Sequence, residues 1–200
     1  LGINLCALRK FDDAHSVYEI LFSSIDDTHF LYHIYRGHFA RLLHFEEKDE
    51  QALEICKNTL ESTDASDPFY GIYEYTFAKM MIDTTFPFDC DNQAHVHNAN
   101  TAIRYAHLAI HHTTESLDQF EPRHRINAWM TMAEAYSALD LHTEAIHYSR
   151  KALNASLHQL EDTHPDVYTY KFNLLAYSKR AFGLTQAIVD ELTTLVSDLE

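Results

Sequence analysis

The sequence predicts an all-α protein in which antiparallel helix pairs stack into a right-handed α-superhelix. Two observations lead to this prediction. Alanine recurs at the start of five amphipathic segments, and the chain holds only four glycines and four prolines in 200 residues. Few helix breakers and many good helix formers favour helices over strands. A small residue that returns at a near-constant interval indicates repeats of one supersecondary unit.

The recurring alanines mark where the second helix of each pair begins. They are Ala14, Ala52, Ala102, Ala145 and Ala187, separated by 38, 50, 43 and 42 residues. A large apolar residue follows each alanine by eight positions, namely Phe22, Leu60, Ile110, Leu153 and Leu195. First helices fit the same frame upstream, with Phe39-Ala40, Phe77-Ala78 and Met132-Ala133 at matching positions. In the last pair the matching dipeptide is either Leu174-Leu175 or Leu175-Ala176.

The clearest pair carries a family motif. Trp129, Met132, Ala133 and Tyr136 share one helical face, and Ala145 follows nine residues after Tyr136. This pattern resembles the tetratricopeptide repeat (TPR), W-x2-L-G-x2-Y followed by A. The spacing of about 42 residues and the His164-Pro165-Asp166-Val167 segment are similar to the longer TPRs of kinesin light chains and of some bacterial regulators. The resemblance covers nearly the whole chain and implies a scaffold for protein partners.

We expect residues 1–200 to form a single TPR-like domain of about five repeats. The first repeat is truncated, and residues 84–98, with Pro87 and the acidic residues Asp89 and Asp91, interrupt the third pair as an insertion. An apolar stripe in the last helix lacks a following helix to cover it: Ile188, Leu192, Leu195 and Leu199. Terminal repeats normally present a polar outer face. We therefore expect either a fragment of a longer protein or a homodimer formed through this stripe.

The net charge argues against nucleic acid and membranes as partners, and the cysteines indicate the cellular setting. Thirty acidic against fifteen basic residues give a formal charge of −15, which repels nucleic acid and anionic membranes. No apolar run reaches the roughly 18 residues of a membrane span. The three cysteines, Cys6, Cys56 and Cys90, form no CxxC motif and indicate no disulfide framework, so a cytoplasmic setting is the simplest expectation.

The fifteen histidines raise the question of a metal site. His107 and His111 are four residues apart on one helix, beside His112, and the insertion adds Asp89, Cys90, Asp91, His95 and His97. A zinc-dependent activity at this cluster is therefore an alternative. Without a His-Glu-x-x-His motif, a Gly-rich phosphate loop or a nucleophile motif, we expect no resident metal, no cofactor and no catalytic residue.

The first helices of stacked pairs line the concave side of such a superhelix. The repeat frame places there Arg41, His44, Tyr75, Lys79, Asn127, Met130, Glu134, Ser137, Asn173 and Arg180. This mixed aromatic, cationic and amide set suits an extended peptide or a partner helix. Arg41, Lys79 and Arg180 further suggest a locally positive groove and a ligand with carboxylates. The set departs from the two-Lys, two-Asn clamp of chaperone-binding TPR domains, so that role is not carried over.

The leading interpretation is therefore a non-catalytic module that binds a protein or peptide in its concave groove. A second interpretation makes the chain the sensory or regulatory part of a larger bacterial signalling protein, such as a transcription regulator or a diguanylate cyclase. The metal-dependent activity is the third. Sequence beyond Glu200 would separate the first two, because an effector domain there would indicate regulation.

Overall fold

The computed structural model describes residues 2, 5, 8–29, 31–85, 87–89, 91–116, 122–161 and 164–197; of residues 113–116, 122, 192 and 195–197 it describes the backbone alone. Within these residues all regular structure is α-helical, as expected. The helices are α2 (Phe11–Ser24), α3 (Tyr32–Phe45), α4 (Asp49–Ser62), α5 (Tyr70–Asp83), α6 (Gln93–Ser116), α7 (Pro122–Ala138), α8 (His142–Leu157), α9 (Pro165–Phe182) and α10 (Gln186–Ser197).

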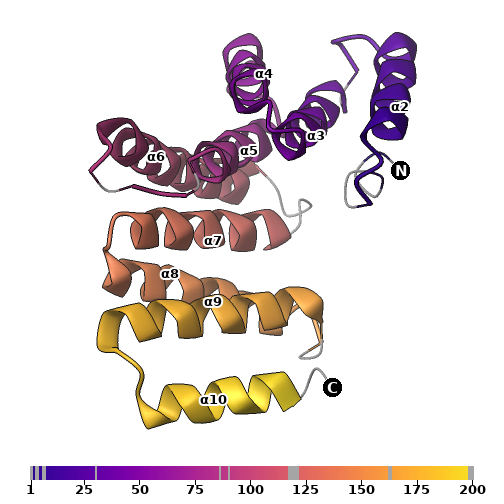
Figure 1. The fold of residues 1–200 in the computed structure, drawn as a ribbon. Helices are drawn as coiled ribbons and strands as arrows, with labels where there is room; N and C mark the ends of the chain where they lie inside the picture. The colour runs from indigo at the N-terminus through magenta and orange to yellow at the C-terminus, as the bar shows by residue number, and fades with distance from the viewer. Residues whose placement is uncertain are drawn as a thin grey trace.

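Successive helices pack as antiparallel hairpins, and the array of hairpins turns between α2–α6 and α7–α10 (Figure 1). The helices α3, α5, α7 and α9 are the first members of their pairs, and α2, α4, α6, α8 and α10 are the second members. First helices also touch one another along the stack, as α3 with α5 and α5 with α7. No described helix has the length and apolar character needed to cross a bilayer.

The recurring alanines explain how closely the hairpins nest. Ala14, Ala52, Ala102 and Ala145 are fully buried, and the main core runs continuously from α3 to α7. A methyl group at these positions lets neighbouring helix backbones approach, and large residues one or two turns away fill the remaining space. Gly37 serves the same purpose on α3, because a Cβ there would lie 3.1 Å from the Thr76 side chain of α5.

The fifth alanine was assigned to the wrong residue. Ala187 is exposed, whereas its neighbour Ile188 is buried against Leu175 and Tyr168. Ile188 stands 43 residues after Ala145, the separation that also joins α7 side chains to their partners on α9. The last repeat is thus one residue longer than the sequence alignment assumed. Within the expected apolar stripe Ile188 is covered by α9, and the side chains of Leu192, Leu195 and Leu199 lie outside the described residues.

One turn geometry precedes three of the second helices, α2, α4 and α8. The backbone N–H of Lys10, Lys48 and Leu141 each donates to the carbonyl five residues earlier, at 2.9 Å. The residue before each donor has a positive φ: 55° at Arg9, 62° at Glu47 and 58° at Asp140. This left-handed residue reverses the chain in the short space available and starts the next helix at a fixed place. The equivalent residue after α9 is Gly183, with φ of 76°.

The insertion in the third pair is shorter than expected. Helix α6 begins at Gln93, so residues 93–98 are helical and extend α6 toward its N-terminus. Asn92 caps this helix, because its Oδ1 accepts from the Ala94 N–H at 2.9 Å. Asparagine is common both in loops and at helix N-caps. Asn92 and residues 93–98 were therefore expected to belong to the insertion, although residues 93–98 form the first turns of α6.

Candidate functional site

The C-terminal halves of α3, α5 and α7, together with residues from the middle to the C-terminal end of α9, surround a groove with a volume of about 1030 Å³. The segment that follows α5 forms another wall. The residues that line the groove are His44, Glu47, Asp49, Lys79, Ile82, Asp83, Thr85, Pro87, Phe88, Glu134, Ser137, Ala138, Asp140, Phe172, Asn173, Ala176, Tyr177 and Arg180. Six of the ten residues expected on the concave face belong to this set: His44, Lys79, Glu134, Ser137, Asn173 and Arg180.

An ion pair crosses the groove between α5 and α7. Lys79 Nζ lies 2.8 Å from Glu134 Oε2 and 2.6 Å from Asp83 Oδ1. Burial opposes the charge on Lys79, but the Glu134 and Asp83 carboxylates outweigh this effect and hold the pKa of Lys79 above its usual value. Lys79 is therefore permanently protonated, and its charge is matched from within the chain.

Helices α7 and α9 are joined by bonds between equivalent positions of successive repeats. Arg180 donates to Ser137 Oγ at 2.9 Å, the Tyr170 hydroxyl bonds to Asn127 Oδ1 at 3.2 Å, and Arg123 pairs with Asp166 at 2.9 Å. All three pairs are separated by 43 residues. This offset aligns Met132-Ala133 with Leu175-Ala176 and settles the register of the last repeat.

Two solved structures share this arrangement of stacked helix pairs. The chain is similar to a kinesin-light-chain-like protein from Podosopora anserina made of nearly identical TPR-like repeats. A single-substitution variant of that protein superposes with a TM-score of 0.67 at 14% identity, covering 99% of this chain and 91% of that one. A second structure of the protein gives a TM-score of 0.63 at 14% identity, with coverage of 100% and 92%. No protein-family model and no curated protein sequence matches the chain.

The chain has a TPR-like repeat fold. Both similar structures extend along the full length of this chain, so the likeness includes every described hairpin. At 14% identity the similarity concerns the fold, and the chemistry of the groove has to be read from this chain's own residues.

The TPR-like groove is acidic, which contradicts the expectation of a positive surface. Its lining contains five carboxylates, from Glu47, Asp49, Asp83, Glu134 and Asp140, against the permanent cations of Lys79 and Arg180. The sequence interpretation counted residues on the helical face alone. Several of the carboxylates lie in the turns and helix ends, where the repeat frame does not assign a direction.

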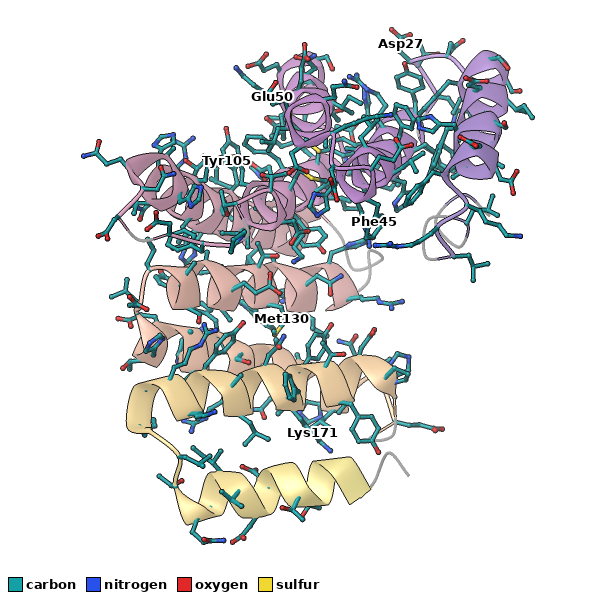
Figure 2. The ribbon with its side chains drawn as sticks, viewed as in Figure 1. Asp27, Phe45, Glu50, Tyr105, Met130 and Lys171 are labelled. Carbon is teal, nitrogen blue, oxygen red and sulfur yellow. The ribbon has the colours of Figure 1, made fainter. Side chains whose placement is uncertain are left out.

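Four residues expected on the concave face lie outside the groove: Arg41, Tyr75, Asn127 and Met130. Met130 is buried between α7 and α8, where its sulfur lies 4.0 Å from Ser149 Oγ (Figure 2). Asn127 is engaged by Tyr170, as described above. Arg41 is exposed on α3, and Tyr75 is half-buried on α5.

The groove does not extend to the N-terminal ends of α7 and α9, because contacts between these two helices close that region. The Asn127–Tyr170 and Arg123–Asp166 bonds hold the N-terminal halves of α7 and α9 together. The hydroxyl of Tyr170 is removed from water there, and burial raises its pKa to about 12. Asn127 and Tyr170 therefore pack between these two helices, whereas the groove-lining residues begin at Glu134 on α7 and at Phe172 on α9.

The histidines of the proposed metal cluster have other partners. His112 Nδ1 lies 2.6 Å from Glu74 Oε2, and the His107 ring packs edge-on against Tyr148. His95 accepts from the Asp89 N–H at 3.1 Å. Among the described residues there is no group of three or more His, Cys, Asp or Glu side chains that could hold a metal ion. Cys90 of the cluster and Cys6 lie outside the described residues.

Cys56 is the one cysteine within the described part of the chain, and it belongs to the core. Its side chain is buried in the cluster formed by α3 to α7. Burial raises the pKa of the thiol to about 12, so Cys56 stays protonated at neutral pH.

A smaller hollow of about 520 Å³ lies between α4 and α6. Phe77 and Met81 of α5 form its floor, and Lys57 and Arg104 stand at its rim. This hollow opens between two second helices, whereas the larger groove is lined mainly by first helices, and α5 contributes different residues to each. The two surfaces are thus distinct and can be tested independently.

Proposed function

We propose that this chain is a protein-interaction scaffold that holds an extended segment of a partner protein in its concave groove and performs no catalysis itself. The observation that supports this proposal is the groove of about 1030 Å³, to which four successive first helices contribute. Stacked helical repeats present concave surfaces of this kind to their ligands.

The dimensions of the groove suit an extended peptide. Neighbouring packed helices have axes about 8–10 Å apart, so a path across four of them is about 27 Å long. An extended chain rises about 3.3 Å per residue, so about eight residues of a partner would cover this path. A helix needs about eighteen residues for the same length and a wider trough.

The lining offers the contacts that an extended chain requires. Asn173 on α9 carries an amide donor and an acceptor, which can bridge the N–H and C=O groups of a peptide backbone. Ile82, Phe88 and Tyr177 provide apolar and aromatic surface for alternate side chains. Affinity would come from the backbone contacts, and selectivity from the side chains between them.

The test uses peptides selected on the 200-residue chain from a displayed library of random eight-residue sequences. Asn173→Trp fills the groove, and Asn58→Trp makes the same exchange at an exposed position of α4. We expect Asn173→Trp to weaken the selected peptides at least about tenfold, because bulk replaces the groove that they occupy. Asn58→Trp should change their affinity by less than about twofold. Equal binding to both variants would contradict the proposal, provided that circular dichroism shows both to be folded.

A further inference from the structure

The charge of the groove carries an inference about its ligand, which rests on the proposed function. Five carboxylates enter the groove from three places in the stack. Glu47 and Asp49 come from the turn after α3 and the start of α4, Asp83 from the end of α5, and Glu134 and Asp140 from the end of α7 and its turn. A segment that crosses the groove therefore meets negative charge from α3 to α7, whereas α9 contributes Arg180 and no carboxylate.

The two permanent cations of the groove are already engaged. Lys79 lies between Asp83 and Glu134 at 2.6 and 2.8 Å, so an incoming carboxylate would have to displace one of them. Arg180 donates to Ser137 at 2.9 Å and keeps its positive charge. Two histidines are also close: His44 bonds to Asp49 at 2.7 Å, and His142 lies 3.7 Å from Asp140. The five carboxylates and the two cations Lys79 and Arg180 together give the lining a net charge of −3.

The apolar part of the lining suits long cationic side chains. Phe88, Phe172 and Tyr177 surround the same space, and Phe172 is 56% exposed. The methylene stems of lysine and arginine pack on such surfaces while the charged ends reach carboxylates. Aromatic rings also attract the cation itself. Lys79 is an example within the chain of a lysine bound in this groove, because two groove carboxylates hold its ammonium group.

We propose that the partner segment is cationic: an extended peptide that carries lysine or arginine at alternate positions. This chemistry is opposite to that suggested by the cationic residues in the sequence, because Lys79 is neutralised internally and the turn carboxylates decide the charge. A segment with carboxylates would meet Glu47, Asp83 and Asp140 without a free counter-charge from Lys79.

The experiment measures fluorescence anisotropy of three labelled eight-residue peptides at 150 mM salt, where charges more than about 8 Å apart are largely screened. The peptides alternate serine with lysine, glutamate or glutamine. The groove variant is Glu47→Gln with Asp140→Asn, which neutralises two lining carboxylates. The matched control is Glu19→Gln with Glu54→Gln, which makes the same charge change at exposed positions of α2 and α4.

We expect the lysine peptide to bind more tightly than the other two. The groove variant should weaken it about tenfold, and the control less than about twofold, because close charge pairs act locally. Equal weakening by both variants would show attraction to the net charge of −15 alone and would overturn the inference.

The remaining outcomes separate this inference from the proposed function. If the glutamine or glutamate peptide binds as tightly as the lysine peptide and Asn173→Trp abolishes that binding, the groove is the binding site and its cation preference is refuted. If Asn173→Trp leaves the binding of every peptide unchanged, both proposals fall. Absence of binding by all three peptides at millimolar concentration would also overturn the cation preference.

Discussion

Lys79 on α5 and Glu134 on α7 occupy the same position in successive repeats, and their side chains form an ion pair with 2.8 Å between Nζ and Oε2. The same relationship joins Ser137 to Arg180 between α7 and α9. Equivalent positions of neighbouring repeats thus meet on the concave side. As a result, the residues that line the groove also hold the stack together, and a change in one repeat alters the contacts of the next.

Removing the ammonium of this pair should destabilise the fold. Lys79→Met leaves Glu134 and Asp83 facing each other without a counter-charge, in partly buried surroundings. We expect the free energy of unfolding to fall by about 1–2 kcal/mol, less than for a fully buried pair because about a third of Lys79 is exposed. Urea denaturation at pH 7 measures the change. Lys79→Met with Glu134→Met should recover part of it, and strict additivity of the two substitutions would show that the residues are not coupled.

The alanine positions should differ sharply in their tolerance of a larger side chain. Ala145 is fully buried where α8 meets its neighbours, whereas Ala187 is exposed. Ala145→Leu should lower the free energy of unfolding by about 1–3 kcal/mol, because the added atoms overpack the helix interface. Ala187→Leu should change it by less than about 0.5 kcal/mol. Thermal denaturation of both variants tests the register of the last repeat, and a large loss from Ala187→Leu would contradict the 43-residue alignment.

Gly183 is required by its backbone conformation. Its φ of 76° and ψ of −177° lie in a region that only glycine adopts readily. A Cβ at this position would meet no heavy atom within 4 Å, so the cost of Gly183→Ala is a backbone cost, about 1–3 kcal/mol. Faster amide exchange in α10 would report the loss. A variant as stable as the parent chain would show that the turn relaxes without strain.

Glu47→Gly is the reverse of Gly183→Ala at an equivalent turn, and we expect it to raise the free energy of unfolding. Glu47 adopts φ of 62° at the equivalent turn after α3, where a side chain is disfavoured. Glycine removes this strain at some cost in unfolded-chain entropy, so we expect a net gain of about 0.5 kcal/mol. Urea denaturation of this variant beside the parent chain measures the gain, and a loss of stability would contradict the expectation.

The carboxyl group of Glu74 should make stability depend on pH. Burial raises the pKa of Glu74, and the hydrogen bond from His112 only partly offsets this effect. The unfolded chain therefore ionises first as the pH rises, and the stabilisation by the neutral carboxyl is lost between about pH 4.5 and the higher folded-state pKa. Glu74→Gln should raise the free energy of unfolding by about 1 kcal/mol at pH 7.5, and the two proteins should converge at pH 4. A constant difference across this range would refute this explanation.

The sequence was sufficient to predict the helix pairs, because small residues in a repeated frame can be recognised without coordinates. Ala14, Ala52, Ala102 and Ala145 are buried as predicted. The repeat frame gave the wrong residue at Ala187. The last repeat is one residue longer than the frame assumes, so Ile188 occupies the buried position. An alignment based on alanine alone does not detect one extra residue in a turn.

The groove was predicted in part for a physical reason. The repeat frame assigns residues to the concave face of each first helix, and Lys79, Glu134 and Arg180, which it assigns there, line the groove. It does not show that α7 and α9 close over their N-terminal halves, which removes Asn127 and Met130 from the open surface. Nor does periodicity give the direction of residues in turns.

The acidic charge of the groove was missed because helical periodicity does not assign a direction to residues in turns. The turn carboxylates of Glu47 and Asp140 follow the helices whose faces were read from periodicity, so the acidic lining was missed. A signal was present in the sequence, because both residues occupy the same turn position in their repeats. Aligning the turns as well as the helices brings Glu47 and Asp140 to one position, which is occupied by Arg9 and Gly183 in the first and last repeats.

The most direct test of the groove as the binding site is photo-cross-linking of a library-selected peptide that carries a benzophenone group. After irradiation, mass spectrometry of proteolytic fragments locates the adducts. Binding in the concave groove predicts adducts on the C-terminal halves of α5, α7 and α9, at groove-lining residues such as Ile82, Ala138 and Ala176. Adducts confined to α4 and α6, around the smaller hollow, would contradict it.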